Sequence, residues 1–424
     1  MSKIILPDTL AEGIKKVYSS EKDRLRAEER IKSLAELFSE IYPEQDGKEC
    51  VIVSAPGRTE ICGNHTDHNN GKVMAAAVDL DAICCAVRTD DMTVRVKSAE
   101  YAKIDVVDLK DLEPQPEETG RSAALIRGVA ARFVQLGYKI GGFDAVTMND
   151  VFSGSGLSSS AAFEVLIATA MNHLFNDGVI SAPEIAKIAQ YAENAFFGKP
   201  CGLMDQMACS VGGFVKIDFA DPASPVITPI AFDPAEYGYT LCITDTRADH
   251  ADLTEDYAAI RGEMEAVAAV FGKKCLREVD EDEFISNIAR VKETVSERAV
   301  LRALHFFAEN RRVDLAADAL ENGDFDSFKA VIIDSGESSY KYNQNVFSST
   351  KPTSQPVSLA LALSERVLRG KGAWRVHGGG FAGTIQAFVP DGLLDEYITT
   401  LEAVFGPGAC HVLSIRALGG CRIA

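Results

Sequence analysis

The sequence predicts an α/β protein of the α+β type with two domains. Three observations lead to this prediction: short apolar runs alternate with helical patterns, 424 residues suffice for two domains with cores of their own, and a proline-rich stretch lies near the middle. Four prolines between positions 221 and 234 make that stretch the best linker candidate. We therefore expect an N-terminal domain at residues 1–225 and a C-terminal domain at residues 226–424.

The composition is typical of a globular protein that binds small ligands. Hydrophobic residues make up 46% of the chain and charged residues 25%, and the formal net charge is -19. This charge argues against nucleic acid as a partner, because affinity for nucleic acid comes largely from Lys and Arg. No apolar stretch approaches the length of a membrane span, and the first residues lack a signal-peptide pattern, so we expect no membrane partner. The ten cysteines form no Cys-x-x-Cys pair, which predicts reduced thiols in a cytoplasmic protein.

The first half of the chain predicts helices around one sheet. The helix from Ser20 to Tyr42 has a possible capping box in Ser20 and Asp23 and an apolar stripe on one face. The helix from Ala161 to Phe175 is apolar nearly throughout and is expected to be buried. The other expected elements are strands at residues 50–54, 73–78, 82–88, 93–96 and 143–148 and helices at residues 120–136 and 183–197.

The second half predicts one further strand at residues 240–244 followed mainly by helices. These helices are expected at residues 281–290, 296–310, 313–321 and 357–369, and residues 335–356 are expected to form a long surface loop. Gly378 to Gly383 fits the dinucleotide-binding pattern G-x-G-x-x-G, which requires a helix directly afterwards. A strand-like alternation follows instead and ends at Pro390, so we interpret the glycines as a hairpin turn packed closely against another loop.

The stretch from Asn149 to Ala162 predicts a site for an anion. Gly154 and Gly156 permit a tight turn, and three serines follow where the buried helix begins. A helix N-terminus offers free N–H groups and a positive dipole end, which suit a nucleotide phosphate. No Lys follows the glycines, so this is not a Walker A loop, and a serine-capped helix after a glycine turn remains an alternative.

A polar segment from Ala55 to Lys72 lies between two expected core strands. Arg58 has the charge to neutralise a transferring phosphoryl group, and Asn64, His65 and Asp67 have donors and acceptors suited to sugar hydroxyls. A solvated surface loop is the alternative interpretation.

A second glycine-rich segment, from Gly198 to Gly213, contains one carboxylate in an apolar setting. Asp205 is flanked by Met204 and Met207, which makes it a candidate general base. The alternative is that Asp205 caps a short helix. Glu193, near the buried face of the preceding helix, either faces solvent or helps to hold a cation.

Taken together, these segments resemble the motifs of the GHMP small-molecule kinases, and of the galactokinase family in particular. The matching stretches are Pro56 to Lys72, Gly154 to Ala162, Cys201 to Gln206 and Gly378 to Gly383, in the family's order. The resemblance implies a GHMP kinase fold with a mixed N-terminal sheet, a ferredoxin-like C-terminal domain and an active site in the cleft between them. It also implies an ATP-dependent sugar 1-kinase that uses Mg2+ and is a monomer or a weak homo-oligomer.

The resemblance implies a role for each matching residue. Asp205 matches the catalytic acidic residue and Arg58 its positively charged partner, while Ser160 and Glu193 match the magnesium ligands. The positions matching sugar contacts are Asn64, His65, Asp67, Gly202 and Tyr257, and those matching the phosphate-binding turn are Gly154, Ser155, Gly156, Leu157, Ser158, Ser159 and Ser160.

Asn64 is the main departure, because galactokinases usually carry Glu there, in contact with the sugar's C6 hydroxymethyl group. Asn accepts a hydrogen bond from a hydroxyl but also tolerates a carboxylate, which Glu would repel. The expected substrate is therefore galactose, with a C6-altered sugar such as galacturonate as the alternative. A non-catalytic sugar sensor is a further alternative, although such sensors resemble kinases with a damaged serine loop and this loop is whole.

Overall fold

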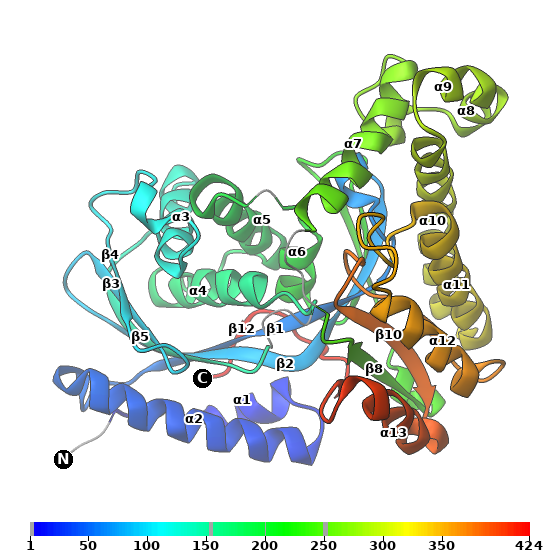
Figure 1. The fold of residues 1–424 in the computed structure, drawn as a ribbon. Helices are drawn as coiled ribbons and strands as arrows, with labels where there is room; N and C mark the ends of the chain where they lie inside the picture. The colour runs from blue at the N-terminus through cyan, green and yellow to red at the C-terminus, as the bar shows by residue number, and fades with distance from the viewer. Residues whose placement is uncertain (1–3, 152–155, 200, 249–252) are drawn as a thin grey trace.

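The computed structural model describes residues 4–151, 156–199, 201–248 and 253–424, which are organised around two β-sheets (Figure 1). In this part of the chain the large sheet has the order β12-β1-β2-β5-β3-β4, with β6 paired to β2 and β7 to β6. Its strands are β1 (Val51–Cys62), β2 (Lys72–Arg88), β3 (Thr93–Ser98), β4 (Ile104–Asp108), β5 (Phe143–Asn149), β6 (Phe214–Asp218), β7 (Val226–Ile230) and β12 (Cys421–Arg422). The small sheet has the antiparallel order β11-β8-β10-β9 and consists of β8 (Tyr239–Asp245), β9 (Ala373–Val376), β10 (Thr384–Pro390) and β11 (Cys410–Leu413).

Helices cover both faces of the large sheet (Figure 1). The face that positions the site carries α3 (Ser122–Gln135), α4 (Ser159–Phe175), α5 (Ala182–Ala192) and α6 (Met204–Val211), and the opposite face carries α1 (Leu10–Val17) and α2 (Glu21–Ile41). Helix α4 lies between the sheet and other helices, and this explains why its sequence is apolar on all sides.

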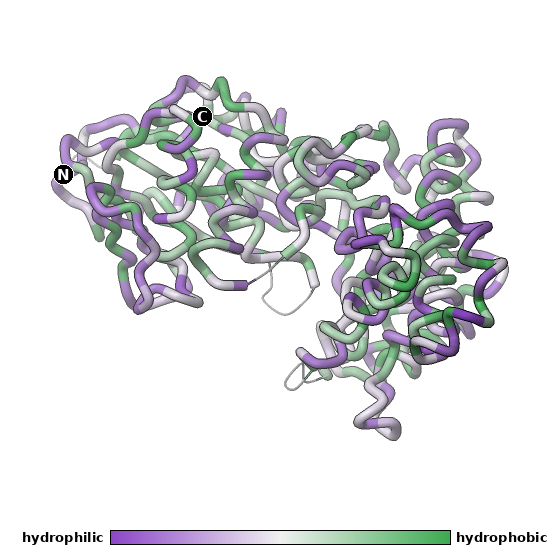
Figure 2. Tube along the Cα trace, turned by 90° about the horizontal axis from the view of Figure 1, so that it is seen from above, coloured by the Kyte–Doolittle hydropathy of each residue, from purple (hydrophilic) through white to green (hydrophobic). Residues whose placement is uncertain are grey.

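The remaining helices lie with the small sheet on the other side of the molecule (Figure 1). They are α7 (Thr254–Val270), α8 (Glu281–Ser286), α9 (Ile288–Thr294), α10 (Glu297–Glu321), α11 (Phe325–Ser338), α12 (Pro356–Leu368) and α13 (Leu394–Phe405). Seen from above, hydrophobic segments run through the interior of both halves and hydrophilic segments gather at the periphery (Figure 2). No helix among the described residues has the length and apolar character to cross a membrane.

Most expected elements are present, and three local signals are confirmed. Ser20 caps α2 by accepting a hydrogen bond from the Asp23 N–H over 3.0 Å. Helix α4 begins directly at the serines, and β9 and β10 form the hairpin expected around the Gly378 to Gly383 turn.

Several boundaries differ from the expectation. Strand β1 does not end at Ser54 but continues to Cys62, because its pairing with β2 resumes after the Pro-Gly pair. Pro56 pairs with Asp81 and Arg58 with Ala77, and the extra residues of this register shift lie on β2. The two strands expected at residues 73–78 and 82–88 are one strand, β2, in which buried Asp81 is neutralised by Arg30 and Arg416.

The helical region also differs from the expectation. The helices expected at residues 296–310 and 313–321 are one helix, α10, while the helix expected at 281–290 is divided into α8 and α9. The expectation of a surface loop at residues 335–356 is wrong for residues 335–343. Helix α11 extends to Ser338, and a π-helical turn, Ser339–Asn343, follows it. Polar side chains in this segment are buried and hydrogen bonded, so their polarity did not indicate exposure.

The chain crosses between the two halves more than once. Strand β7 lies beyond residue 225 yet pairs with β6 in the large sheet, and the C-terminal strand β12 returns to pair with β1. The division at residues 225 and 226 stays a prediction, and these pairings place the start and end of the second segment in the large sheet.

Candidate active site

Helix α4 begins at a turn with an unusual backbone. Gly156 has a φ of 72°, and Ser158, directly before the helix, has φ 60° and ψ 60°, the left-handed region that serine seldom adopts. The Ser158 side chain does not cap the helix, so a serine cap does not explain this residue. Its hydroxyl instead donates to Asp205 Oδ2 over 2.5 Å. Gly154 and Ser155 lie outside the described residues.

Strand β1 is held against this turn. The Arg58 N–H donates to the Leu157 carbonyl over 3.0 Å, and the Arg58 guanidinium donates through Nη1 to the Gly156 carbonyl. A side chain at Gly57 would meet the Leu157 carbonyl at 2.9 Å, so glycine permits this close approach. Two motifs far apart in the sequence therefore share one backbone junction.

Asp205 meets this junction from α6. Arg58 Nε and Nη2 both bind Asp205 Oδ1 at 2.8 Å, and the Arg58 side chain is 8% exposed against 33% for Asp205. Burial acts to raise the pKa of Asp205, but Arg58 and Ser158 hold the pKa below its ordinary value. Asp205 is therefore a partly exposed, ionised carboxylate whose position is set by a buried arginine.

Ser160 and Glu193 lie on neighbouring segments beside Asp205. Glu193 is buried, and its Oε1 accepts a hydrogen bond from Ser160 Oγ over 3.4 Å and lies 3.3 Å from Lys199 Nζ. Its Oε2 accepts a hydrogen bond from Gln206 Nε2 over 2.7 Å, and Gln206 Nε2 also donates to Glu164 over 3.1 Å. Gln206, the residue after Asp205, thus connects α6 to both carboxylates.

The same residues fit a magnesium ion that is completed by substrate. Within the described residues, no group of three or more His, Cys, Asp or Glu side chains is arranged to hold a metal. Mg2+ needs no such cage, because it is commonly held by one or two protein oxygens together with substrate phosphates. Ser160 and Glu193 supply a hydroxyl and a carboxylate beside the start of α4, where a phosphate would lie.

Asp67 and Gly202 form a second contact close to Asp205. A Cβ on Gly202 would lie 2.1 Å from Asp67 Oδ2, so glycine leaves room for this carboxylate. Burial raises the pKa of Asp67 to about 6, with further increases from the charges of Asp205 and Glu60. Asp67 and Asp205 therefore lie in one electrostatic environment.

His65 and Tyr257 meet at the turn between β9 and β10. His65 Nε2 lies 2.9 Å from the Gly379 carbonyl, and burial lowers the pKa of His65, so the neutral ring donates to this carbonyl. The Tyr257 hydroxyl donates to the Gly380 carbonyl over 3.0 Å, and a Cβ on Gly379 would lie 2.5 Å from the Tyr257 ring. The glycines of this turn allow the two sugar-binding candidates to approach it.

Asn64 differs from the other candidates because protein groups occupy its side chain. It is fully buried, its Nδ2 donates to Glu60 Oε1 over 2.9 Å and to the Gly378 carbonyl over 2.7 Å, and its Oδ1 accepts from Asn345 over 2.8 Å. A direct sugar contact would require the loss of at least one of these bonds.

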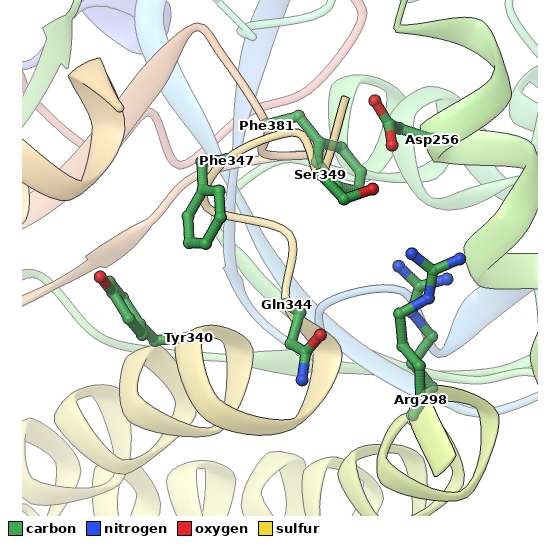
Figure 3. A pocket seen from close by; sticks show the side chains of 8 residues that line it. Asp256, Arg298, Tyr340, Gln344, Phe347, Ser349 and Phe381 are labelled. Atoms are coloured by element: carbon green, nitrogen blue, oxygen red, sulfur yellow. The ribbon is translucent and has the colours of Figure 1, made fainter. Parts of the chain in front are cut away.

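A separate cavity of about 310 Å³ contains none of the predicted site residues (Figure 3). One of its lining residues, Phe381, lies in the turn between β9 and β10 and contacts the Tyr257 ring with 5.4 Å between ring centroids, so the cavity adjoins this turn from the side of α7 and α10. Its lining residues are Asp256, Arg298, Arg302, Tyr340, Gln344, Phe347, Ser349 and Phe381.

Sequence reasoning missed Glu60, Glu164 and Gln206. Glu164 and Gln206 are fully buried polar residues flanked by apolar residues in α4 and α6, a signal that was available in the sequence. Glu60 was missed because β1 was expected to end before it.

Comparison with protein-family models gives two matches. Residues 36–88 match the galactokinase galactose-binding signature, and residues 124–213 match the N-terminal domain of GHMP kinases. Among similar proteins, the galactokinase of Glaesserella parasuis is 34% identical over 80% of this chain and 85% of its own length. The galactokinase of Streptomyces coelicolor is 32% identical over 88% of this chain and 92% of its own.

Solved structures show the same fold. Lactococcus lactis galactokinase in complex with galactose superposes with a TM-score of 0.77 at 22% identity, covering 91% of this chain and 98% of that chain. Methanococcus jannaschii mevalonate kinase gives a TM-score of 0.61 at 14% identity, covering 88% and 99%. These similarities confirm the predicted GHMP fold.

Proposed function

Because the chain belongs to the galactokinase family of the GHMP kinases, we propose that it transfers a phosphoryl group from ATP to the anomeric hydroxyl of galactose. The observation that carries this proposal is the position of Asp205. It is bound by Arg58 and Ser158 at the start of α4, and it is near enough to Asp67 for its charge to raise the pKa of Asp67. One carboxylate thus adjoins both the phosphate site and the sugar site.

ATP phosphates would bind at the start of α4, where free N–H groups and the helix dipole favour negative charge. Arg58 lies at the same turn and lowers the cost of placing a phosphoryl group near Asp205. Ser160 and Glu193 would hold Mg2+, which supplies charge neutralisation on the phosphates when it is bound. The ten cysteines are free, which supports the further proposal of a cytoplasmic enzyme. A monomer or weak homo-oligomer stays a proposal that rests on the family resemblance.

Asp205 would accept a hydrogen bond from the anomeric hydroxyl and orient that oxygen toward the phosphate. A carboxylate with a lowered pKa is a weak base, so its main contributions are position and charge. It would take the hydroxyl proton as the sugar oxygen bonds to the γ-phosphorus and the bond from that phosphorus to the ADP oxygen breaks, releasing ADP. Asp67 and His65 would hold other sugar hydroxyls, with Gly202 and Tyr257 shaping the space around them.

A coupled assay of ADP release tests the proposal. Galactose should support turnover, with 2-acetamido-2-deoxygalactose, galacturonate, glucose and arabinose as comparison sugars, and NMR should place the phosphate on the anomeric oxygen. Binding of galactose and ATP without ADP release would indicate a sensor, which the intact segment from Ser158 to Ala162 and the ordered Asp205 disfavour. Failure to bind or phosphorylate galactose would refute the proposal.

A further inference from the structure

Galactokinases usually carry Glu where this chain has Asn64, and another carboxylate, that of Glu60, lies within hydrogen-bonding distance of Asn64. Asn64 donates to Glu60 Oε1, and the other hydrogen of its amide is bound by the Gly378 carbonyl. The Asn64 side chain therefore has no free donor for a ligand. It holds one oxygen of the Glu60 carboxylate, which belongs to the same chain segment.

Glu60 has one oxygen bound to protein and one free for a ligand. Its Oε1 accepts hydrogen bonds from Asn64 and from Arg375 Nη2, at 2.9 and 3.0 Å. Glu60 is buried, with 5% of its surface exposed, and its Oε2 has no hydrogen-bond partner among the described residues. Because Oε2 is not one of the fully buried unpartnered atoms, part of this small exposed surface belongs to that oxygen. Asn64, the residue before His65, donates to Glu60 Oε1 over 2.9 Å, so the carboxylate lies beside the segment that carries His65 and Asp67. Consistent with this position, the Glu60 charge acts to raise the pKa of both residues.

We propose that Glu60, and not Asn64, supplies the acidic acceptor for the C6 hydroxymethyl group of the sugar. This inference rests on the proposed galactose kinase function and concerns the same site. Asn64 and Arg375 act as positioning residues, because together they hold Oε1 and leave Oε2 toward the ligand.

The assignment changes the expected substrate class. An ionised carboxylate only accepts hydrogen bonds, so Glu60 suits the C6 hydroxyl of galactose and repels the C6 carboxylate of galacturonate. Arg375 does not reverse this preference, because its side chain is fully buried and it donates to Glu60 Oε1 and the Ile61 carbonyl. The substrate is therefore a sugar with an uncharged C6 hydroxymethyl group.

The test compares Glu60→Gln with the wild-type enzyme on galactose, 6-deoxygalactose and galacturonate. Galactose and 6-deoxygalactose differ only in the hydroxyl that Glu60 is proposed to bind. In the variant, kcat/KM for galactose should fall about 10- to 100-fold, mainly through KM, while the fall for 6-deoxygalactose should be at most a few-fold. Wild-type enzyme should prefer galactose to galacturonate, and the variant should narrow this preference.

Glu118→Gln is a matched control, because Glu118 makes a comparable ion pair with the largely buried Arg127, at 2.6 Å, away from the proposed sugar-binding residues. Glu118→Gln should leave the ratio of kcat/KM for galactose to kcat/KM for 6-deoxygalactose unchanged. Equal losses for galactose and 6-deoxygalactose in Glu60→Gln would overturn the inference, since they would indicate a purely structural role. If that variant does not fold, the wild-type comparison decides: no discrimination against 6-deoxygalactose, or a preference for galacturonate, overturns it. Wild-type enzyme inactive on all three sugars would refute the proposed kinase function instead.

Discussion

Replacement of Asp205 should separate catalysis from binding and from stability. Asp205→Asn keeps an oxygen that accepts from Arg58 but removes the charge and the basic site. We expect kcat to fall roughly 100- to 10,000-fold, the range for a positioned proton acceptor, with galactose affinity changed only a few-fold. Asp205→Ala should be as inactive and should also lower the free energy of unfolding by about 3 kcal/mol, because it leaves the buried Arg58 guanidinium without its carboxylate. This cost is at the low end of the usual range because Asp205 is itself 33% exposed.

Three measurements check this expectation. Single-turnover phosphorylation reports the chemical step, titration calorimetry with galactose reports binding, and denaturant unfolding reports the stability difference between the Asn and Ala variants. Asp314→Asn is a suitable control, because Asp314 pairs with Lys72 and Lys216 and is 38% exposed. Turnover by Asp205→Asn within tenfold of wild type would refute the catalytic role. Equal stability of the Asn and Ala variants would refute the account of Arg58.

Three further predictions concern Asp67, Gly202 and Asn64, which lie at or beside the proposed sugar site. Because burial raises the pKa of Asp67 to about 6 and only the ionised form accepts two hydroxyl hydrogen bonds, kcat/KM for galactose should decline as pH falls below about 6, and Asp67→Asn should abolish this acid limb in a pH-rate profile. Gly202→Ala should raise KM for galactose about tenfold with a smaller effect on kcat, because its Cβ would displace the Asp67 carboxylate; an unchanged KM in steady-state kinetics would contradict this. Asn64→Glu should cost about 3 kcal/mol of stability by placing a second carboxylate on Glu60 and Arg375, and combining it with Glu60→Gln should recover more than half of that loss in denaturant unfolding.

Sequence patterns predicted the elements whose signals are local. The Ser20 cap and the buried α4 follow from composition and spacing within a few residues, and the structure has both. The errors arose where a distant residue cancels a local signal. Residues 296–310 and 313–321 were expected to form two helices, yet α10 continues through Arg311 and Arg312, which pair with Glu281 and Glu309.

The candidate site shows the same division between features that local sequence signals predicted and features that depend on distant contacts. Arg58, Asp205 and Ser158 were selected one by one for their chemistry, and the structure brings the three together in one hydrogen-bonded group. Glu60 was not selected, because residues 55–72 were expected to form a polar loop, and its place in β1 depends on pairing with β2 that continues beyond a register shift.

The segment from Gly63 to Asp67, which carries sugar-binding candidates, depends for its geometry on residues outside the motif. Glu309 Oε1 accepts hydrogen bonds from the N–H groups of Gly63 and Asn64, at 3.0 and 3.3 Å, and His305 Nε2 lies 2.9 Å from the Asn64 carbonyl. Burial acts to raise the pKa of Glu309, but His305, Arg375 and other neighbours hold it at about 2, so its negative charge persists at working pH. Helix α10 thereby fixes the backbone on which His65 and Asp67 depend, although it lies far away in the sequence. The residue types in this segment support the proposed sugar contacts, and contacts from α10 fix where the segment lies.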